Sequence, residues 1–119
     1  MENKEFSKQL ELRTKKFAIS IIKLSASIPN TPEGKVLKYQ LTKAGTSVGA
    51  NYREANRARS KADFTNKIRI SEGEASETVY WLEILSELNW LDAQLLLLII
   101  TEAVELLAIF TSISKKLKL

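Results

Sequence analysis

The chain has 119 residues, enough for one domain whose hydrophobic core needs no disulfide or structural metal. It contains neither cysteine nor histidine, which excludes thiol catalysis, cysteine- or histidine-ligated zinc and the usual general base for hydrolysis near neutral pH. The net charge of +4 is uneven: residues 35–69 hold nine Lys/Arg and two acids, whereas residues 70–114 hold eight acids and no Lys or Arg. This polarity suits an anionic partner, and it equally suits one helix docking against another.

The sequence also bears on cellular location. The first sixteen residues, MENKEFSKQLELRTKK, lack the apolar segment of a signal peptide. The longest uninterrupted apolar run, LLLLII at residues 95–100, is much shorter than the about twenty residues that cross a bilayer. We therefore expect a cytoplasmic protein without a membrane partner.

Apolar spacing predicts helices at about residues 4–27, 32–58, 61–89 and 93–117, and no segment alternates in the manner of a strand. In the first helix the apolar positions recur at spacings of three, four and seven: Phe6, Leu10, Phe17, Ile21 and Leu24. Turn residues separate the helices, and the expected N-caps are Thr31 (before Pro32), Ser60 and Asp92. Long helices joined by short turns predict an all-α, antiparallel up-down-up-down four-helix bundle that forms a single domain over residues 1–119.

The second predicted helix has an apolar face and an opposite basic face. The apolar face carries Leu37, Leu41, Ala44, Val48, Tyr52 and Ala55, and the basic face carries Lys35, Lys43, Arg53 and Arg57. Gly45 and Gly49 share one flank, where small residues allow a neighbouring helix to approach closely. Asn51 lies at the edge of the apolar face, and we interpret it as a polar residue that fixes helix register.

The third predicted helix has more apolar surface than one bundle requires. Its core line is Phe64, Ile68, Ala75, Val79 and Leu82, and a second line, roughly 120° away, is Ile70, Trp81, Ile84 and Leu88. Glu74 and Glu77 flank the second line. The run LLLLII is likewise apolar around its whole circumference. A homo-oligomer explains this surplus, with the second line and its two glutamates as the interface.

Clustered glutamates raise the alternative of a metal-dependent enzyme that uses Glu72, Glu74 or Glu77. The di-iron pattern of helical bundles needs Glu-x-x-His ligands, and this chain has no histidine. We expect these carboxylates to be exposed or to pair with Lys or Arg across a subunit contact. The sequence therefore predicts no catalytic residue, metal or cofactor.

The basic face continues into the following turn through Arg59 and Lys61. Lys35, Lys43, Arg53, Arg57, Arg59 and Lys61 form a candidate nucleic-acid-binding surface, because each cation could neutralise a phosphate. The alternative is a solvated face, or one that pairs with the acidic helix of a neighbour. Repetition of the patch in an oligomer favours nucleic-acid binding.

The stretch TSVGANYREANRARSKADFTNKIRISEGEASETVYWLEIL at residues 46–85 resembles the four-helix-bundle proteins encoded by intervening sequences of bacterial 23S ribosomal RNA genes. The distinctive positions are Ser47, Val48, Ala50, Asn51, Glu54, Ser60, Asp63, Phe64, Glu74, Glu77 and Tyr80 to Glu83, with Gln40 and Leu41 upstream. Where many members have an Asn-Ile-Ala-Glu-Gly type of run, this chain has Asn51-Tyr-Arg-Glu-Ala55.

The resemblance implies an up-down-up-down bundle that assembles as a homopentamer and has no established catalytic residues. It also implies kinship with the accessory protein of diversity-generating retroelements, a basic pentamer that engages nucleic acid and a reverse transcriptase. The favoured hypothesis is a non-enzymatic homo-oligomer that binds RNA or another nucleic acid. The alternative is an oligomeric adaptor that binds a protein partner and no nucleic acid.

Overall fold

The computed structural model of the chain describes residues 4–117, and these residues form helices and turns with no strand. The helices are α1 (Lys4–Ala26), α2 (Pro32–Ala55), α3 (Lys61–Leu88) and α4 (Ala93–Lys116). The predicted all-α fold with four helices is confirmed. Helix α2 ends three residues earlier than the sequence pattern predicts, because the Arg57 and Ala58 amides bond the carbonyls three residues back, of Glu54 and Ala55, which tightens the last turn before the chain bends toward the next N-cap.

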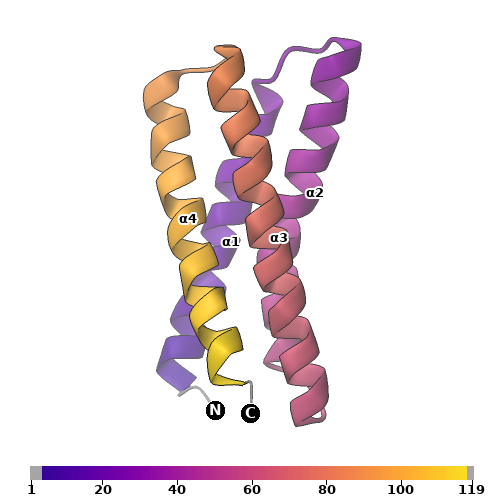
Figure 1. Cartoon of the computed structure of the whole chain (residues 1–119), viewed down its shortest axis with the longest axis vertical. Helices are drawn as coiled ribbons and strands as arrows, with labels where there is room; N and C mark the ends of the chain where they lie inside the picture. Colours follow the sequence, from indigo (N-terminus) through magenta and orange to yellow (C-terminus); the bar gives the residue numbers. More distant parts are fainter. Residues whose placement is uncertain (1–3, 118–119) are drawn as a thin grey trace.

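The four helices lie side by side along the 44 Å long axis of the molecule (Figure 1). The α1–α2 and α3–α4 turns lie at the upper end of Figure 1, and the α2–α3 turn and both chain ends lie at the lower end. Each helix packs against its neighbours in the sequence, and α4 also touches α1, less extensively. Helices α1 and α3 are therefore diagonal across the bundle, as are α2 and α4.

Side-chain caps set the starts of three helices as predicted. The Gly34 amide donates to the Thr31 hydroxyl at 3.0 Å, the Asp63 amide donates to Ser60 at 3.0 Å, and Asp92 accepts from two amides at the start of α4. Each cap satisfies amides that have no partner within the helix, and such a cap typically contributes about 1 kcal/mol. The turns are short because each new helix begins directly at its cap.

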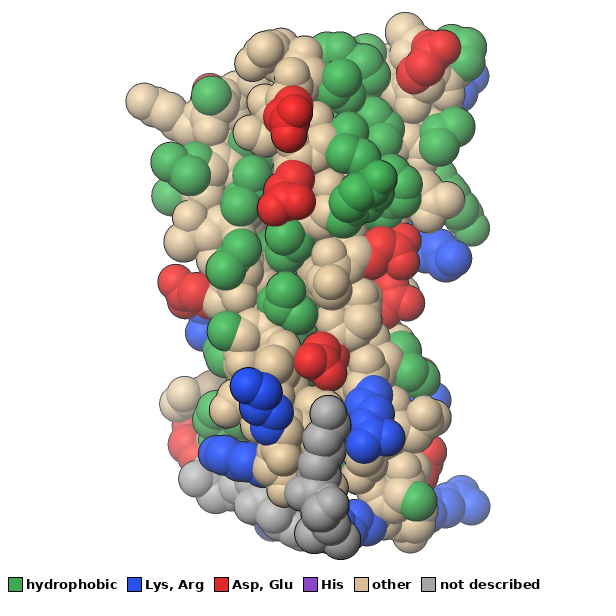
Figure 2. Space-filling model, viewed as in Figure 1, with side chains coloured by type: hydrophobic (Ala, Val, Ile, Leu, Met, Phe, Trp, Pro, Cys, Tyr) green, Lys and Arg blue, Asp and Glu red, His purple; other side chains and the backbone are tan. Residues whose placement is uncertain are grey.

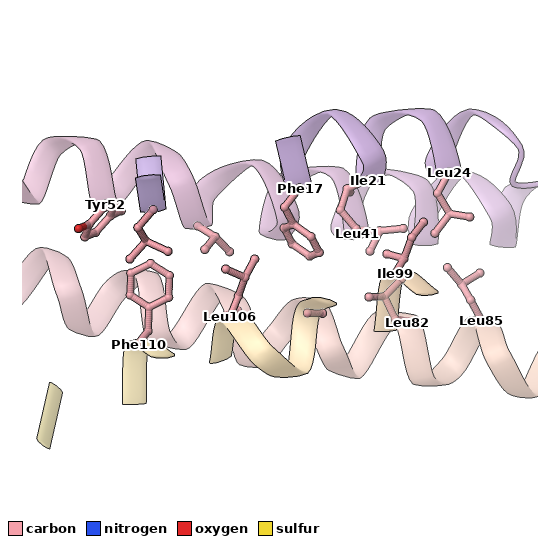
Figure 3. Close-up of a cluster of buried hydrophobic side chains, with 14 of the residues drawn as sticks. Phe17, Ile21, Leu24, Leu41, Tyr52, Leu82, Leu85, Ile99, Leu106 and Phe110 are labelled. Carbon is pink, nitrogen blue, oxygen red and sulfur yellow. The ribbon is translucent and has the colours of Figure 1, made fainter. Parts of the chain in front are cut away.

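The core runs the length of the bundle and draws on all four helices (Figure 3). Tyr52 of α2 and Phe110 of α4 meet edge to face, with ring centroids 5.4 Å apart, although these helices are diagonal. In α3 the core differs from the predicted line in detail. Leu85, which the prediction omitted, is fully buried, whereas Phe64 and Val79 are half-buried at the margin. The core faces of α2 and α3 otherwise agree with the helical spacing.

Close packing between α1 and α2 explains two of the glycines. A Cβ atom added to Gly45 would lie 2.7 Å from Ile21, and one added to Gly49 would lie 2.9 Å from Thr14. These separations are too short for a real side chain, so the predicted close approach is confirmed. Only glycine lets α1 and α2 pack at this distance.

An ionic cluster joins α1 to α4. The Arg13 guanidinium donates to Glu102 at two positions and to Glu105 at one, each at 2.7 Å. The hydrogen bonds to Glu102 raise the pKa of Arg13 above its usual value, and the one to Glu105 adds to the effect. This cluster supports the helix pair that packs least extensively.

Helix α4 is more apolar than the six-residue run indicates. It has 24 residues, and its most apolar stretch of 18 residues has a mean hydropathy of 2.1, which matches the length and composition of a membrane-crossing helix. Its inner face, however, belongs to the bundle core through residues such as Ile99, Leu106 and Phe110, and core helices of water-soluble proteins meet the same criterion. Only 28% of this 18-residue stretch is buried, so the outer face of α4 is an exposed apolar surface.

Candidate nucleic-acid interface

The six predicted basic residues are all exposed. Lys35 lies in the first turn of α2 and Lys43 at the middle of this helix. Arg53 lies in its last turn, Arg57 and Arg59 in the α2–α3 turn and Lys61 at the first position of α3, at the lower end of Figure 1. Ten residues separate Lys43 from Arg53, about 15 Å along the helix. The fold therefore divides the predicted surface into an upper pair and a lower group, which we call the α2 basic end: Arg53, Arg57, Arg59 and Lys61.

Most of these cations have no acidic partner. Arg53 lies 3.4 Å from Glu11, and the Asn56 amide also donates to that carboxylate at 2.9 Å. Among residues 4–117, no carboxylate lies within 4.0 Å of the other five: Lys35, Lys43, Arg57, Arg59 and Lys61. Their charges are therefore available to an anion in solution.

A groove between α1 and α2 leads into the α2 basic end. It has a volume of about 480 Å³, and the small residues Ala18, Gly49 and Ala50 line it together with Lys15, Arg53 and Arg57. Two acids also line the groove, Glu11 and Glu54. Each is bound by a cation: Glu11 by Arg53, and Glu54 by Lys67, whose ammonium donates at 2.7 Å and whose pKa this bond raises. Lys15 and Arg57 remain to attract an anion.

The fold adds cations that the sequence interpretation missed. Because both chain ends lie at the lower end of the bundle, Lys4 and Lys8 of α1 and Lys115 and Lys116 of α4 join the end that carries the α2–α3 turn (Figure 1). Figure 2 shows the result on the face formed by α3 and α4, where Lys and Arg gather in the lower part and hydrophobic side chains in the upper part. The contribution of these lysines could have been predicted from the antiparallel order of the helices, because that order places the α2–α3 turn beside both termini.

The predicted oligomer interface lies together on the outer side of α3. Ile70, Glu74, Trp81 and Ile84 are half-buried, and Glu77 and Leu88 are exposed. The Trp81 indole donates to Glu77 at 3.1 Å and meets the Tyr80 ring edge to face, with centroids 5.0 Å apart. Partial burial raises the pKa of Glu74, the nearby charge of Glu77 adds to this, and Lys43 opposes it.

Asn51 makes its side-chain hydrogen bond within α2, where the amide donates to the Ser47 carbonyl at 2.9 Å. A buried hydrogen bond between α2 and α3 comes instead from Ser71, whose hydroxyl donates to the Val48 carbonyl at 2.9 Å. Ser71 therefore ties the two helices at the height at which Asn51 was expected to act. The role of Asn51 in helix register stays a prediction.

Residues 4–117 contain no cluster of three or more Asp or Glu side chains placed to hold a metal ion. What they do present is an all-α, four-helix protein with a basic end, an open groove and uncovered apolar faces. This chain belongs to the 23S rRNA-intervening sequence protein family, whose family model matches residues 6–112. The resemblance of residues 46–85 to this family is thereby confirmed.

A solved structure is similar over nearly the same region. It is a protein with unknown function from the S23 ribosomal protein family of Bacteroides thetaiotaomicron VPI-5482, 36% identical in sequence, with a TM-score of 0.81. The match covers 88% of this chain and 97% of that one. No curated protein sequence matches the chain. The relatives therefore establish family and fold.

Proposed function

We propose that this protein is a non-enzymatic homo-oligomer that binds RNA or another nucleic acid through the α2 basic end and the adjoining outer surface of α2. The observation that carries the proposal is the group of exposed cations without acidic partners at the α2 basic end, Arg57, Arg59 and Lys61. Cations of this kind bind phosphates and release counterions, which gives affinity that depends little on base sequence.

The groove beside this end supports the same function. An extended phosphate chain that enters between α1 and α2 would pass Lys15 and Arg57, while the groove acids are already bound by Arg53 and Lys67. Self-association strengthens the attraction, because each added copy repeats the basic end and multiplies its field. The family resemblance implies five copies, and the apolar residues on the outer side of α3 support association.

The second candidate is an oligomeric adaptor that binds a protein partner and no nucleic acid. The exposed apolar residues favour it, notably Leu97 and Leu98 of α4, which are 64% and 71% exposed. This candidate predicts that association with RNA is absent even at low ionic strength. The two candidates are therefore separated by one binding measurement.

The test is fluorescence anisotropy with a labelled RNA hairpin over a range of salt concentrations. We expect the logarithm of the binding constant to fall linearly with the logarithm of salt concentration, and the Arg57→Gln variant to lose about one unit of that slope. Lys38→Gln removes the same charge from α2 outside the predicted surface and should change the slope little. Absence of binding at low salt, or equal effects of both variants, would contradict nucleic-acid binding through this surface.

A further inference from the structure

We propose that each protomer docks the outer face of its α1 onto the outer face of α3 in the next copy. The inference rests on the self-association in the proposed function and adds the surface that receives the α3 interface. It follows from two complementary faces at diagonal corners of the bundle and from one exposed glycine.

The outer face of α1 combines apolar and basic side chains. Leu12, Ile19 and Ile22 are 52%, 44% and 49% exposed, which is unusual for three large apolar residues on one short helix face. Exposed lysines flank them, and these have no acidic partner among residues 4–117: Lys8, Lys15, Lys16 and Lys23. We call this surface the α1 face.

The outer side of α3 combines apolar side chains with a net negative charge. Its apolar residues Ile70, Trp81, Ile84 and Leu88 are flanked by three acids, Glu74, Glu77 and Glu87, and near the start of the helix by one exposed cation, Arg69; we call this surface the α3 face. Charge complementarity makes a second copy of this chain its occupant. Helix α4 does not supply the counterpart at this height, because the charges of residues 93–114 are two glutamates bound to Arg13, and its lysines, Lys115 and Lys116, lie in the last turn at the lower end of the bundle.

Gly73 marks the position of closest approach. It is exposed in the middle of α3, and a Cβ atom added there would meet nothing within 4 Å. Glycine inside a helix lowers stability relative to alanine, and Gly73, unlike Gly45 and Gly49, has no contact within the protomer that requires it. A neighbouring copy that packs closely at Gly73 would explain why this position is glycine.

Contacts between neighbouring helices place the two faces at the same height. Ile21 of α1 packs on Gly45 of α2, and Ser71 of α3 bonds to Val48 of α2. Counting residues along the antiparallel helices from these two contacts shows that the heights of Ile19 and Gly73 along the bundle axis differ by about one residue rise, about 1.5 Å. By the same count Lys23 lies level with Glu77. In copies related by rotation about an axis along the bundle, Ile19 seats on Gly73 and Lys23 faces Glu77.

Contact between two different faces has a consequence for assembly. It is heterologous, so copies add head to tail until a ring closes. Because α1 and α3 occupy diagonal corners of the bundle, the other two helices make no contact with the next copy. Helix α2, with its basic end, therefore lies on one side of the assembly, and the apolar outer face of α4 lies on the other. Docking therefore leaves the α2 basic end open in every copy, whereas Lys15, at the edge of the groove, belongs to the docked α1 face.

The first test is Gly73→Ala, which should weaken assembly of the native protein but raise the stability of a monomeric variant. By sedimentation equilibrium, the dissociation constant of the assembly should rise about tenfold or more, because the added methyl group overpacks the seat of Ile19. In a monomeric Ile19→Asp background the same substitution should raise the melting temperature by about 4 °C through helix propensity. Ser86→Ala, exposed on the opposite side of α3, is the control and should leave assembly unchanged. Assembly of Gly73→Ala at the affinity of the native protein would overturn the inference.

The second test uses two blocked variants, Ile19→Asp and Gly73→Glu. Both positions are exposed, so each variant should keep the helical circular dichroism of the native protein. Each alone should be monomeric, and an equimolar mixture should form one-to-one dimers, because one native α1 face and one native α3 face remain. Absence of heterodimers, or full assembly of either variant alone, would contradict heterologous docking.

These outcomes separate this inference from the proposed function. A native protein that is monomeric overturns self-association and the inference together. If the native protein is an oligomer and both variants still assemble as it does, the inference is overturned but self-association is not. A native oligomer that responds as expected but does not bind RNA overturns nucleic-acid binding and leaves the inference standing.

Discussion

Gly45 of α2 lies directly against Ile21 of α1, which is fully buried: a Cβ atom on Gly45 would fall 2.7 Å from one of its side-chain carbons and 2.8 Å from another. The position therefore requires glycine for packing, whereas Gly73 on α3 has open space around it. Two glycines in the same bundle thus serve different purposes, and substitution by alanine distinguishes them.

Gly45→Ala should lower the free energy of unfolding by about 1–3 kcal/mol, because α1 must move away to admit the methyl group. The gain in helix propensity, about 1 kcal/mol, offsets only part of this cost. Urea denaturation of Gly45→Ala and Gly73→Ala in the monomeric Ile19→Asp background measures both effects. Equal stabilisation by the two substitutions would contradict the close packing of α1 on α2.

Arg13→Met should weaken the attachment of α4 to α1. The side chains of Arg13 and Glu102 are 35% and 34% exposed, so solvent screens the pair, and we expect a loss of about 1 kcal/mol in the free energy of unfolding. High salt should reduce the difference between variant and native protein. Lys67→Met, which removes the more exposed pair with Glu54, should cost less, and a larger cost for Lys67→Met would refute this ranking.

Ser71→Ala tests the hydrogen bond between α3 and α2. The buried hydroxyl donates to the Val48 carbonyl, and its loss should lower the free energy of unfolding by about 1 kcal/mol. Ser76→Ala, at an exposed position of the same helix, should leave stability nearly unchanged or raise it slightly. The two thermal melts are compared at one protein concentration. A neutral Ser71→Ala variant would show that the bond does not hold the helix pair.

Glu74→Gln should stabilise the protomer in a pH-dependent way. Partial burial raises the pKa of Glu74, so the folded state holds the proton more tightly than the unfolded state does. The resulting stability is present below the unfolded pKa and is lost as the pH rises through the folded pKa. Glutamine should therefore raise the free energy of unfolding at pH 7, with a gain that shrinks as the pH falls toward about 4.

Denaturation of the Ile19→Asp background with and without Glu74→Gln, across this pH range, measures the gain without contributions from a neighbouring copy. Glu83→Gln removes a charge from an exposed site on α3 and serves as the control. A gain that is the same at both ends of the range would rule out burial of the Glu74 carboxylate as its cause.

Local sequence signals predicted most of the fold. The caps at Thr31, Ser60 and Asp92 and the apolar spacing defined the helices, because capping and amphipathicity are properties of neighbouring residues. The end of α2 and the burial of Leu85 were missed. Both depend on where the next element lies, and this is a tertiary property.

The candidate site was predictable only in part. The exposure of Arg57, Arg59 and Lys61 followed from the α2 helical face and the turn after it. The groove beside Lys15 was not predictable, since it depends on how α1 packs across Gly49 and Ala50. The partner of Glu11 is likewise fixed by the fold, because α1 and the end of α2 meet only in the folded bundle.

The central claim is that an oligomer of this chain binds structured RNA through the α2 surface. Sedimentation velocity of the native protein, alone and with a labelled RNA hairpin at low salt, tests it most directly. We expect a protein species heavier than the protomer that cosediments with the RNA and releases it as salt is added. A protein that sediments as a monomer, or an oligomer that leaves the RNA at its free sedimentation rate, would contradict it.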